Sequence, residues 1–219
     1  MDELRETWQM LRVGGPMVYP LVAVGILTVM IILDRAVVYF RSLRLPASVW
    51  EVSEALDFKW EAVEEQLKLL GPRNAYARFL AVITENRSRP VWWIESRADD
   101  EAGRIEKALS RGMWVLETVV TGAPLLGLLG TITGMIQAFK VIGEGGVVAP
   151  TKVTAGVAEA LIATALGLLI AIIALFAFNF FERLRAHALD TMERLGSKLV
   201  AHIRLDQEGK QREQRHEAA

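Results

Sequence analysis

Residues 122–139 read GAPLLGLLGTITGMIQAF, and this uncharged stretch decides the fold class. It belongs to an uncharged segment at residues 118–139, and about 20 apolar residues are enough for a helix to cross the hydrocarbon core of a bilayer. Three internal glycines and two threonines are unexpected in a helix that only anchors a protein in lipid. We therefore expect a transmembrane helix that packs against other helices.

Two further segments have the composition of membrane spans. Residues 16–33 read PMVYPLVAVGILTVMIIL and are extended, after Asp34 and Arg35, by apolar residues 36–40, while residues 160–181 are uncharged throughout. The chain of 219 residues is 52% hydrophobic and 23% charged, with a mean hydropathy of +0.28, so apolar and charged residues are segregated along it. These features predict an all-α membrane protein with three transmembrane helices and long cytoplasmic helical extensions.

The first apolar segment also resembles a cleaved signal peptide. Against this alternative, residues 1–12 contain three acidic residues beside two arginines, and the segment ends in charged residues without an A-x-A-like cleavage site. We therefore expect this segment to be a retained transmembrane helix.

The distribution of Lys and Arg predicts the orientation, because cytoplasmic flanks of membrane spans are enriched in these residues. The basic residues on one set of flanks are Arg35, Arg41, Arg44, Arg104, Lys107, Arg111, Arg183 and Arg185, against only Arg5, Arg12, Lys140 and Lys152 on the other. The N-terminus is therefore expected outside and the C-terminus in the cytoplasm. The expected order is an outer amphipathic segment (1–14), a transmembrane helix (15–40), a cytoplasmic helical loop (41–112), a transmembrane helix (113–142), an outer loop (143–152), a transmembrane helix (153–181), and a cytoplasmic helical extension and tail (182–219).

The charged segments also show helical patterns. In residues 46–111 we expect a helix that ends before the Gly-Pro-Arg break at 71–73, a second helix at 74–85, and a third from about residue 90, whose continuation into the second span stays open. After the third span, the apolar residues that recur every three or four positions are Leu184, Ala188, Met192, Leu195, Leu199 and Ile203. They predict a long helix with one packed face. Residues 206–219 are polar and are expected to be frayed or disordered.

Several function classes find no support in the sequence. The chain has no cysteine, which excludes disulfides, thiolate nucleophiles and Cys-based metal sites. Its three histidines, His187, His202 and His216, lie in charged sequence, where solvated side chains are expected rather than a metal site. Phosphate loops and nucleophile elbows are absent, and the net charge of −1 gives no case for nucleic acid. We expect neither an enzyme nor a cofactor.

Small residues recur on one face of each of the last two spans. They are Gly127, Gly130 and Gly134 in the second, and Gly156, Ala160, Thr164, Gly167, Ala171 and Ala174 in the third. Small side chains let helices in lipid approach closely, and such packing drives their association. We interpret both stripes as helix-packing faces, either within the chain or between subunits.

Three polar residues are the candidate site. If the second and third spans are antiparallel, Thr131 and Thr164 fall in one layer, although a buried threonine hydroxyl can instead bond a carbonyl of its own helix. Glu159 lies at the rim of the third span, on or near the small face. Residues 118–139 and 160–181 contain no ionisable side chain, so a proton path through them requires a carboxylate from a partner.

Three blocks resemble the ExbB/TolQ family of proton-channel subunits, relatives of the MotA stator proteins, and the likeness is ExbB-like. The blocks are GGPMVYPLVAVGILTVMIILDR at 14–35, APLLGLLGTITGMIQAF at 123–139 and AGVAEALIATALGLLIAI at 155–172. The resemblance implies a homopentamer in the bacterial inner membrane whose second and third helices line a pore. That pore would enclose the helices of a dimeric, single-span partner of the ExbD/TolR type, whose aspartate carries protons inward from the periplasm. A TonB/TolA-type client would receive the work.

The resemblance also implies residue roles. Thr131 and Thr164 would face the partner aspartate, Glu159 would form an acidic rim at the proton entrance, and the small stripe would be a smooth pore wall. Two positions depart from the family pattern, because Ile173 stands where a proline is common and Pro150 precedes the third span earlier than usual. Without that proline no kink is expected in the third span.

A non-conducting membrane scaffold is the alternative function, since it would use the same packing faces. The client process stays open among nutrient import, envelope maintenance and motility, as does the choice between ExbB-like and TolQ-like. A proton is preferred over sodium only because three-span relatives commonly use protons.

Overall fold

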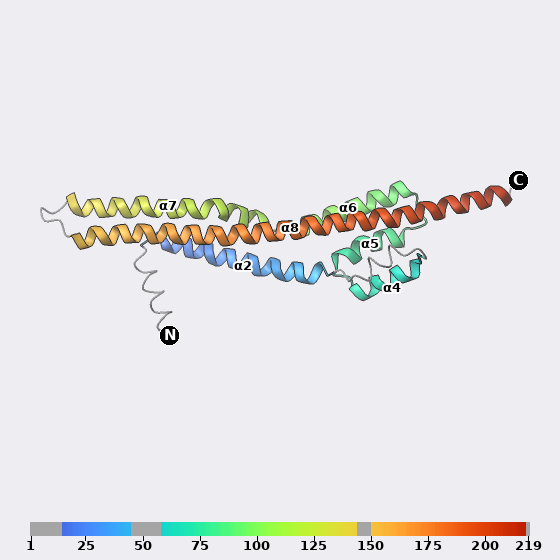
Figure 1. Ribbon diagram of the computed structural model, residues 1–219, viewed down its shortest axis with the longest axis horizontal. Coiled ribbons are helices and arrows are strands. Elements are labelled where there is room, and N and C mark those ends of the chain that lie inside the picture. Colours follow the sequence, from blue (N-terminus) through green and yellow to red (C-terminus); the bar gives the residue numbers. More distant parts are fainter. Residues whose placement is uncertain (1–14, 45–57, 144–149, 218–219) are drawn as a thin grey trace. The chain divides into compact units, whose positions relative to one another are not determined.

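The computed structural model describes residues 15–44, 58–143 and 150–217, all of whose regular elements are helices (Figure 1). The helices are α2 (Val18–Ser42), α4 (Trp60–Leu70), α5 (Ala75–Glu85), α6 (Val91–Ser110), α7 (Met113–Gly143) and α8 (Pro150–Glu217). Three helical segments, which contain α2, α7 and the first part of α8, are long and apolar enough to cross a membrane. The expected all-α fold with three spans is confirmed. The expected segment at 1–14, the start of the helix at 46–70 and most of the loop at 143–152 lie outside the described residues.

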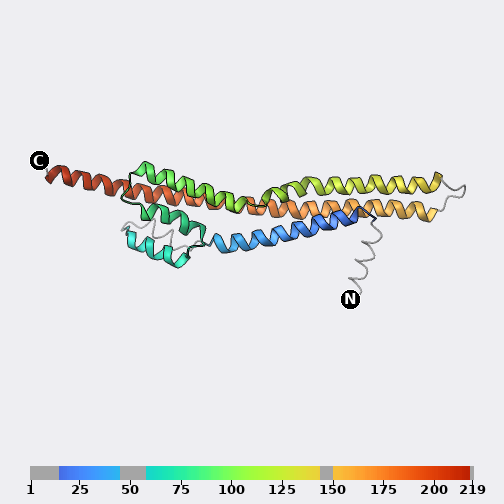
Figure 2. The same cartoon turned by 180° about the vertical axis from the view of Figure 1, so that it is seen from behind.

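The described chain forms two compact units. The apolar unit contains α2 up to Asp34, α7, and α8 up to Phe181, and the charged unit contains the end of α2, α4, α5, α6 and the remainder of α8. In the apolar unit, α2 and α7 both lie beside α8 (Figures 1 and 2). Its buried core is made of Leu21, Val119, Ala123, Ala163, Ile170, Ala171 and Ala174.

The outer surface of the apolar unit is itself apolar. Large side chains such as Leu125, Leu161 and Phe176 are more than 60% exposed. A soluble protein rarely presents so much contiguous apolar surface, whereas a lipid environment requires it. The surface therefore agrees with a unit that is embedded in a bilayer.

α6 and α7 are separate helices, which settles the question that the sequence pattern left open. α6 ends at Ser110, and Gly112 has a φ of +80° before α7 begins at Met113. A positive φ is readily adopted by glycine and ends a helix. Gly112 therefore interrupts the helix, and α6 does not continue into α7.

The charged unit has its own core. From α8, Ala188, Met192, Leu195, Leu199 and Ile203 are all buried, while Leu184 is half-buried, so the predicted packed face of this helix is confirmed. α5 contributes Tyr76, Phe79, Leu80 and Ile83, and α6 contributes Ile94, Ala98, Ile105 and Leu109. The predicted break between α4 and α5 is present at Gly71, whose φ is +75°. Asn74 then caps α5 by accepting hydrogen bonds from the N–H groups of Tyr76 and Ala77.

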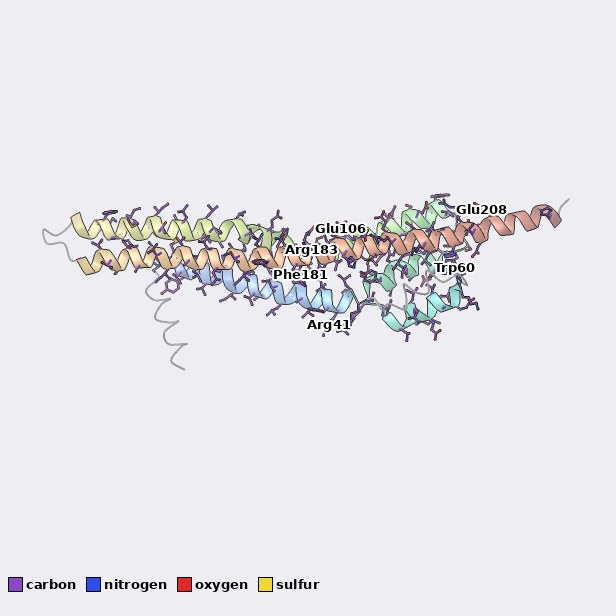
Figure 3. The ribbon with its side chains drawn as sticks, in the orientation of Figure 1. Arg41, Trp60, Glu106, Phe181, Arg183 and Glu208 are labelled. Atoms are coloured by element: carbon purple, nitrogen blue, oxygen red, sulfur yellow. The ribbon has the colours of Figure 1, made fainter. Side chains whose placement is uncertain are left out.

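Polar contacts tie the helices of the charged unit to one another. Arg78 of α5 forms an ion pair with Glu101 of α6, which is almost fully buried. The indole Nε1 of Trp60, labelled in Figure 3, donates to Asp206 of α8 at 3.0 Å. On α8, the Gln207 amide donates to the carbonyl oxygens of Arg87 and Arg89 at 3.2 and 2.9 Å. These bonds tie α8 to the turn between α5 and α6.

Two expectations about the polar end of the chain were wrong. The tail was expected to be frayed or disordered from residue 206, but α8 continues to Glu217. Its Gln, Glu, Lys and Arg residues are good helix formers, which favours a helix there. His202 is not simply solvated, because its ring stacks on Phe58 with centroids 3.9 Å apart and an interplanar angle of 5°. His187 and His216 are exposed.

Candidate functional site

The glycines of α7 lie in its contact with α8. Gly127, Gly130 and Gly134 are all buried. An ideal Cβ placed on Gly130 would be 2.5 Å from the Ala163 Cβ, and one on Gly134 would be 3.0 Å from the Ala160 Cβ. One on Gly127 would be 3.0 Å from the Thr164 Cα. A Cβ at any of these three positions would force neighbouring atoms of α8 to shift.

The small residues of α8 face the same contact. An ideal Cβ on Gly167 would be 2.5 Å from the Ala123 carbonyl oxygen, and one on Gly156 would be 2.9 Å from the Ala138 Cβ. The stripe's three alanines, Ala160, Ala171 and Ala174, are buried as well. The structure therefore places the small stripe in packing within the chain. Residues used in this way are not available as a wall for a further helix while α7 and α8 stay together.

The two candidate threonines make different bonds. Thr164 donates its hydroxyl hydrogen across the helix contact to the Gly127 carbonyl at 3.0 Å. Thr131 donates within its own helix to the Leu128 carbonyl at 2.7 Å. Since Thr164 lies opposite Gly127, the two threonines are about one helical turn, roughly 6 Å, apart along the helix axis. The two hydroxyls were expected in one layer, and the structure places them about one helical turn apart.

A third hydroxyl, which the candidate set omitted, lies next to Thr131. Thr133 donates to the carbonyls of Leu129 and Gly130 at 3.0 and 3.1 Å. The TIT pattern at residues 131–133 was the available signal. Each of the three hydroxyls donates its hydrogen to a backbone carbonyl. Each can therefore take part in a further hydrogen bond only as an acceptor, through its oxygen lone pairs. Such oxygens accept a hydrogen bond from a protonated carboxylic acid, but cannot donate to a carboxylate without breaking the bond they have.

Glu159 lies beside the small stripe of α8, on the side that faces α2. One residue turns a helix by about 100°, so Glu159 is about 60° from Gly156, the nearest member of the small stripe, about 100° from Ala160 and about 140° from Thr164. Its carboxylate contacts Gly15, just before α2. Further along the same face, Ile170 contacts Gly25 of α2. Glu159 therefore faces α2 and is separated from the threonines of the α7–α8 contact.

Residues that the sequence indicated only as orientation signals have a structural role in the charged unit. Arg35 is buried and donates to the Ala108 carbonyl at 3.2 Å, and the Tyr39 hydroxyl donates to the Leu109 carbonyl at 3.4 Å. Arg185 donates to the Ser110 hydroxyl oxygen at 2.6 Å. Cations and donors at a helix C-terminus satisfy its last carbonyls and complement its dipole. By contrast, Arg41 and Arg183 are exposed (Figure 3).

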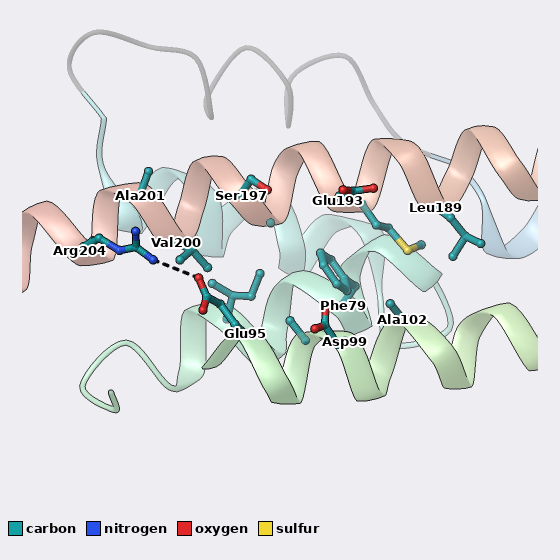
Figure 4. A pocket seen from close by; sticks show the side chains of 14 residues that line it. Phe79, Glu95, Asp99, Ala102, Leu189, Glu193, Ser197, Val200, Ala201 and Arg204 are labelled. Atoms are coloured by element: carbon teal, nitrogen blue, oxygen red, sulfur yellow. Dashed lines mark hydrogen bonds and ion pairs between the residues drawn. The ribbon is translucent and has the colours of Figure 1, made fainter. Parts of the chain in front are cut away.

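The charged unit also has a hollow of about 500 Å³ between α5, α6 and α8 (Figure 4). Its floor includes Phe79, and its rim carries the Glu95–Arg204 ion pair at 3.1 Å. The carboxylates of Asp99 and Glu193 also line it. None of the residues that the sequence proposed as a site lies there, so the candidate site remains in the apolar unit.

Comparison with known proteins identifies the family of the chain. Residues 72–194 match the MotA/TolQ/ExbB proton channel family. The chain is 35% identical over 198 residues to biopolymer transport protein ExbB-like 1 of Synechocystis sp., which covers 85% of this chain and 74% of that protein. It is 33% identical over 133 residues to biopolymer transport protein ExbB of Aquifex aeolicus, with 61% and 84% coverage. The ExbB of Xanthomonas campestris shares 46% identity over 81 residues, with 37% and 32% coverage. On the strength of these matches and its three apolar helices, the chain belongs to the MotA/TolQ/ExbB proton channel family.

Proposed function

We propose that this chain is the multi-span subunit of a proton-driven motor in the bacterial inner membrane. Membership of a proton channel family supports the role of a proton-channel subunit. The proposal adds a homopentamer that encloses the membrane helices of a dimeric ExbD/TolR-type partner. It also adds a client of the TonB/TolA type, on which the motor works from the periplasmic side. The N-terminus is periplasmic and the C-terminus cytoplasmic, as the distribution of basic residues indicates.

One observation carries the proposal. α7 and α8 present hydroxyls at and beside their contact, yet residues 118–139 and 160–181 contain no ionisable side chain. A proton that crosses an apolar layer needs a group to carry it. The carrier must therefore come from another chain, and a single-span partner with one membrane aspartate supplies it.

The hydroxyl geometry suits a neutral carrier. Thr131 and Thr164 offer lone pairs, because both hydroxyl hydrogens are bonded to backbone carbonyls. A protonated aspartic acid on the partner helix can donate to these oxygens. An ionised carboxylate finds no donor there and pays the full desolvation penalty of a charge in an apolar layer. The layer thus favours passage of the protonated form, with Glu159 as the acidic rim at the proton entrance.

Proton uptake by liposomes tests this function. The chain is reconstituted with and without its single-span partner, and acidification of the lumen is followed under an imposed pH gradient. We expect flux only when both chains are present. Replacing the partner's membrane aspartate by asparagine should abolish it, and Thr164→Val should reduce it.

The assembly needs its own measurement. Native mass spectrometry of the purified complex should give five copies of this chain and two of the partner. A stable complex of that composition without flux would contradict the channel role and favour the non-conducting scaffold. The scaffold has one observation in its favour, namely that the small stripe is occupied by packing within the chain.

A further inference from the structure

The residue just before α2 touches the proposed acidic rim. An ideal Cβ placed on Gly15 would be 1.3 Å from Oε1 of Glu159, 2.2 Å from its Cδ and 2.7 Å from its Cγ. The Glu159 carboxylate therefore occupies the volume that a side chain at position 15 would take. Gly15 also has a φ of +70°, a backbone conformation that L side chains rarely adopt. Two independent constraints thus call for glycine at this position.

The turn that holds Gly15 is fixed from two directions. The Gly15 carbonyl accepts a hydrogen bond from the N–H of Val18 at 3.2 Å, which closes the turn onto the first residue of α2. Met17 lies over the α7–α8 contact, since its Cβ is 3.5 Å from the position of an ideal Cβ on Gly130. The turn cannot move without disturbing either α2 or this contact.

The carboxylate lies beside Gly15, three residues before α2 begins at Val18. The first backbone N–H groups of a helix have no partner within it, and the helix dipole places partial positive charge there. A negative side chain is favoured at such a position. The bare backbone of Gly15 lets Glu159 approach this end, whereas any β-carbon would keep it away.

We propose that Gly15 is a positioning residue, which holds the Glu159 carboxylate at the start of α2 and thereby sets the geometry of the proton entrance. This inference deepens the proposed function and rests on it. It assigns a part in conduction to α2, which the sequence alone identifies only as a retained transmembrane helix. Gly15 itself carries no proton, and its effect on flux passes entirely through Glu159.

Disulfide formation tests the contact without any need for flux. The chain has no cysteine, so Gly15→Cys with Glu159→Cys creates a unique pair in the full-length protein. A disulfide requires Cβ atoms about 3.5–4.5 Å apart, which the 2.7 Å approach of the Glu159 Cγ allows. The matched pair Gly25→Cys with Glu159→Cys should not form a bond, because Gly25 lies at Ile170, eleven residues and about 16 Å further along α8. Oxidation of the Gly25 pair to the same extent as the Gly15 pair would overturn the proposed contact.

Proton flux of the complex with its partner tests the positioning role. Gly15→Asn is the informative variant, because asparagine tolerates a positive φ but fills the space of the carboxylate. We expect it to lower flux by the same factor as Glu159→Gln, and to remove the same dependence on external pH. The double variant should be no worse than either single one, because both changes disable one group. Gly25→Ala, also in α2, should keep full flux.

The outcomes separate the two proposals. Multiplied effects in the double variant, or full flux in Gly15→Asn, would overturn the positioning role while leaving the channel in place. Full flux in Glu159→Gln would show that the Glu159 carboxylate is not needed for conduction. It would thereby overturn both the acidic rim and the positioning role of Gly15. A lack of flux in the unsubstituted complex would contradict the proposed function itself. In that case the cysteine pairs alone still decide whether Gly15 holds Glu159.

Discussion

Replacement of Gly167 by alanine is the sharpest test of the α7–α8 contact. The new Cβ would be 2.5 Å from the Ala123 carbonyl oxygen and 3.1 Å from the Gly127 Cα. A carbon normally approaches a carbonyl oxygen to about 3.3 Å, so the helices must separate by roughly 0.8 Å. Both clashing atoms belong to the backbone, and no rotamer change can relieve the contact.

The expected cost follows from this separation. A gap of about 0.5–1 Å forfeits a quarter to a half of each van der Waals contact, and overpacking of this kind costs about 1–3 kcal/mol. Gly122→Ala is the matched control, since an ideal Cβ there has nothing within 4 Å. Both variants gain the same helix propensity, about 1 kcal/mol, so it cancels in their comparison. Their unfolding equilibria should therefore differ by about five- to 150-fold.

Thiol accessibility measures the separation of the two helices. Ala171 is buried in the apolar core, and Ala171→Cys gives the otherwise cysteine-free chain a single reporter. Its rate of modification is followed as the SDS fraction of mixed micelles rises, at a fixed protein concentration because assembly affects apparent stability. The Gly167→Ala protein should expose the reporter at a lower SDS fraction than the Gly122→Ala protein. Coincident curves would refute the close-packed contact.

Three further changes test other parts of the structure. Thr164→Val, which deletes the bond to the Gly127 carbonyl, should reduce proton flux while native mass spectrometry still shows an intact assembly; loss of assembly would make the hydroxyl structural. Asn74→Ala removes the cap of α5 and should destabilise the charged unit by about 1–2 kcal/mol in thermal unfolding followed by circular dichroism. Burial raises the pKa of Tyr76 above its ordinary value of 10.0, against an opposing hydrogen bond with Thr191. The folded protein then keeps a proton that the unfolded chain loses, so its stability should fall as the pH rises above 10, and Tyr76→Phe should weaken this dependence.

Features with a period along one helix could be predicted from the sequence. The spans follow from uninterrupted apolar residues, and the packed face of α8 follows from the recurrence that includes Met192, Leu195 and Leu199. Burial of one helix face requires apolar residues at every third or fourth position, so this spacing can be recognised without knowledge of the neighbouring helix. The small residues of α7 and α8 were recognised as packing faces for the same reason, although the pattern left open whether the partner was in the same chain.

Features that depend on the identity of a neighbour could not be predicted in this way. Arg35 and Arg185 were interpreted through the charge balance of flanks, yet they bond to the end of α6, a segment far away in the sequence. The break between α6 and α7 depends on the positive φ of Gly112. Glycine adopts negative φ values about as readily, so its presence in the sequence does not predict a break. Glu159 was placed on or near the small face, and its contact with Gly15 before α2 depends on a neighbour that the pattern along α8 does not identify.

The faces of α8 limit where a partner helix can lie in the apolar unit. The small stripe packs on α7, and the face of Glu159 and Ile170 packs on α2. The face that neither neighbour covers carries Leu161, Ala165, Leu168 and Ile172, all exposed. Thr164, about 40° from Ala160, stands at the border between the small stripe and this open face. A helix that packs on the open face therefore meets Thr164 at the edge of the α7–α8 contact, with Glu159 turned away toward α2. Under the proposed function, the hydroxyl and the carboxylate would therefore act at separate points of the proton path.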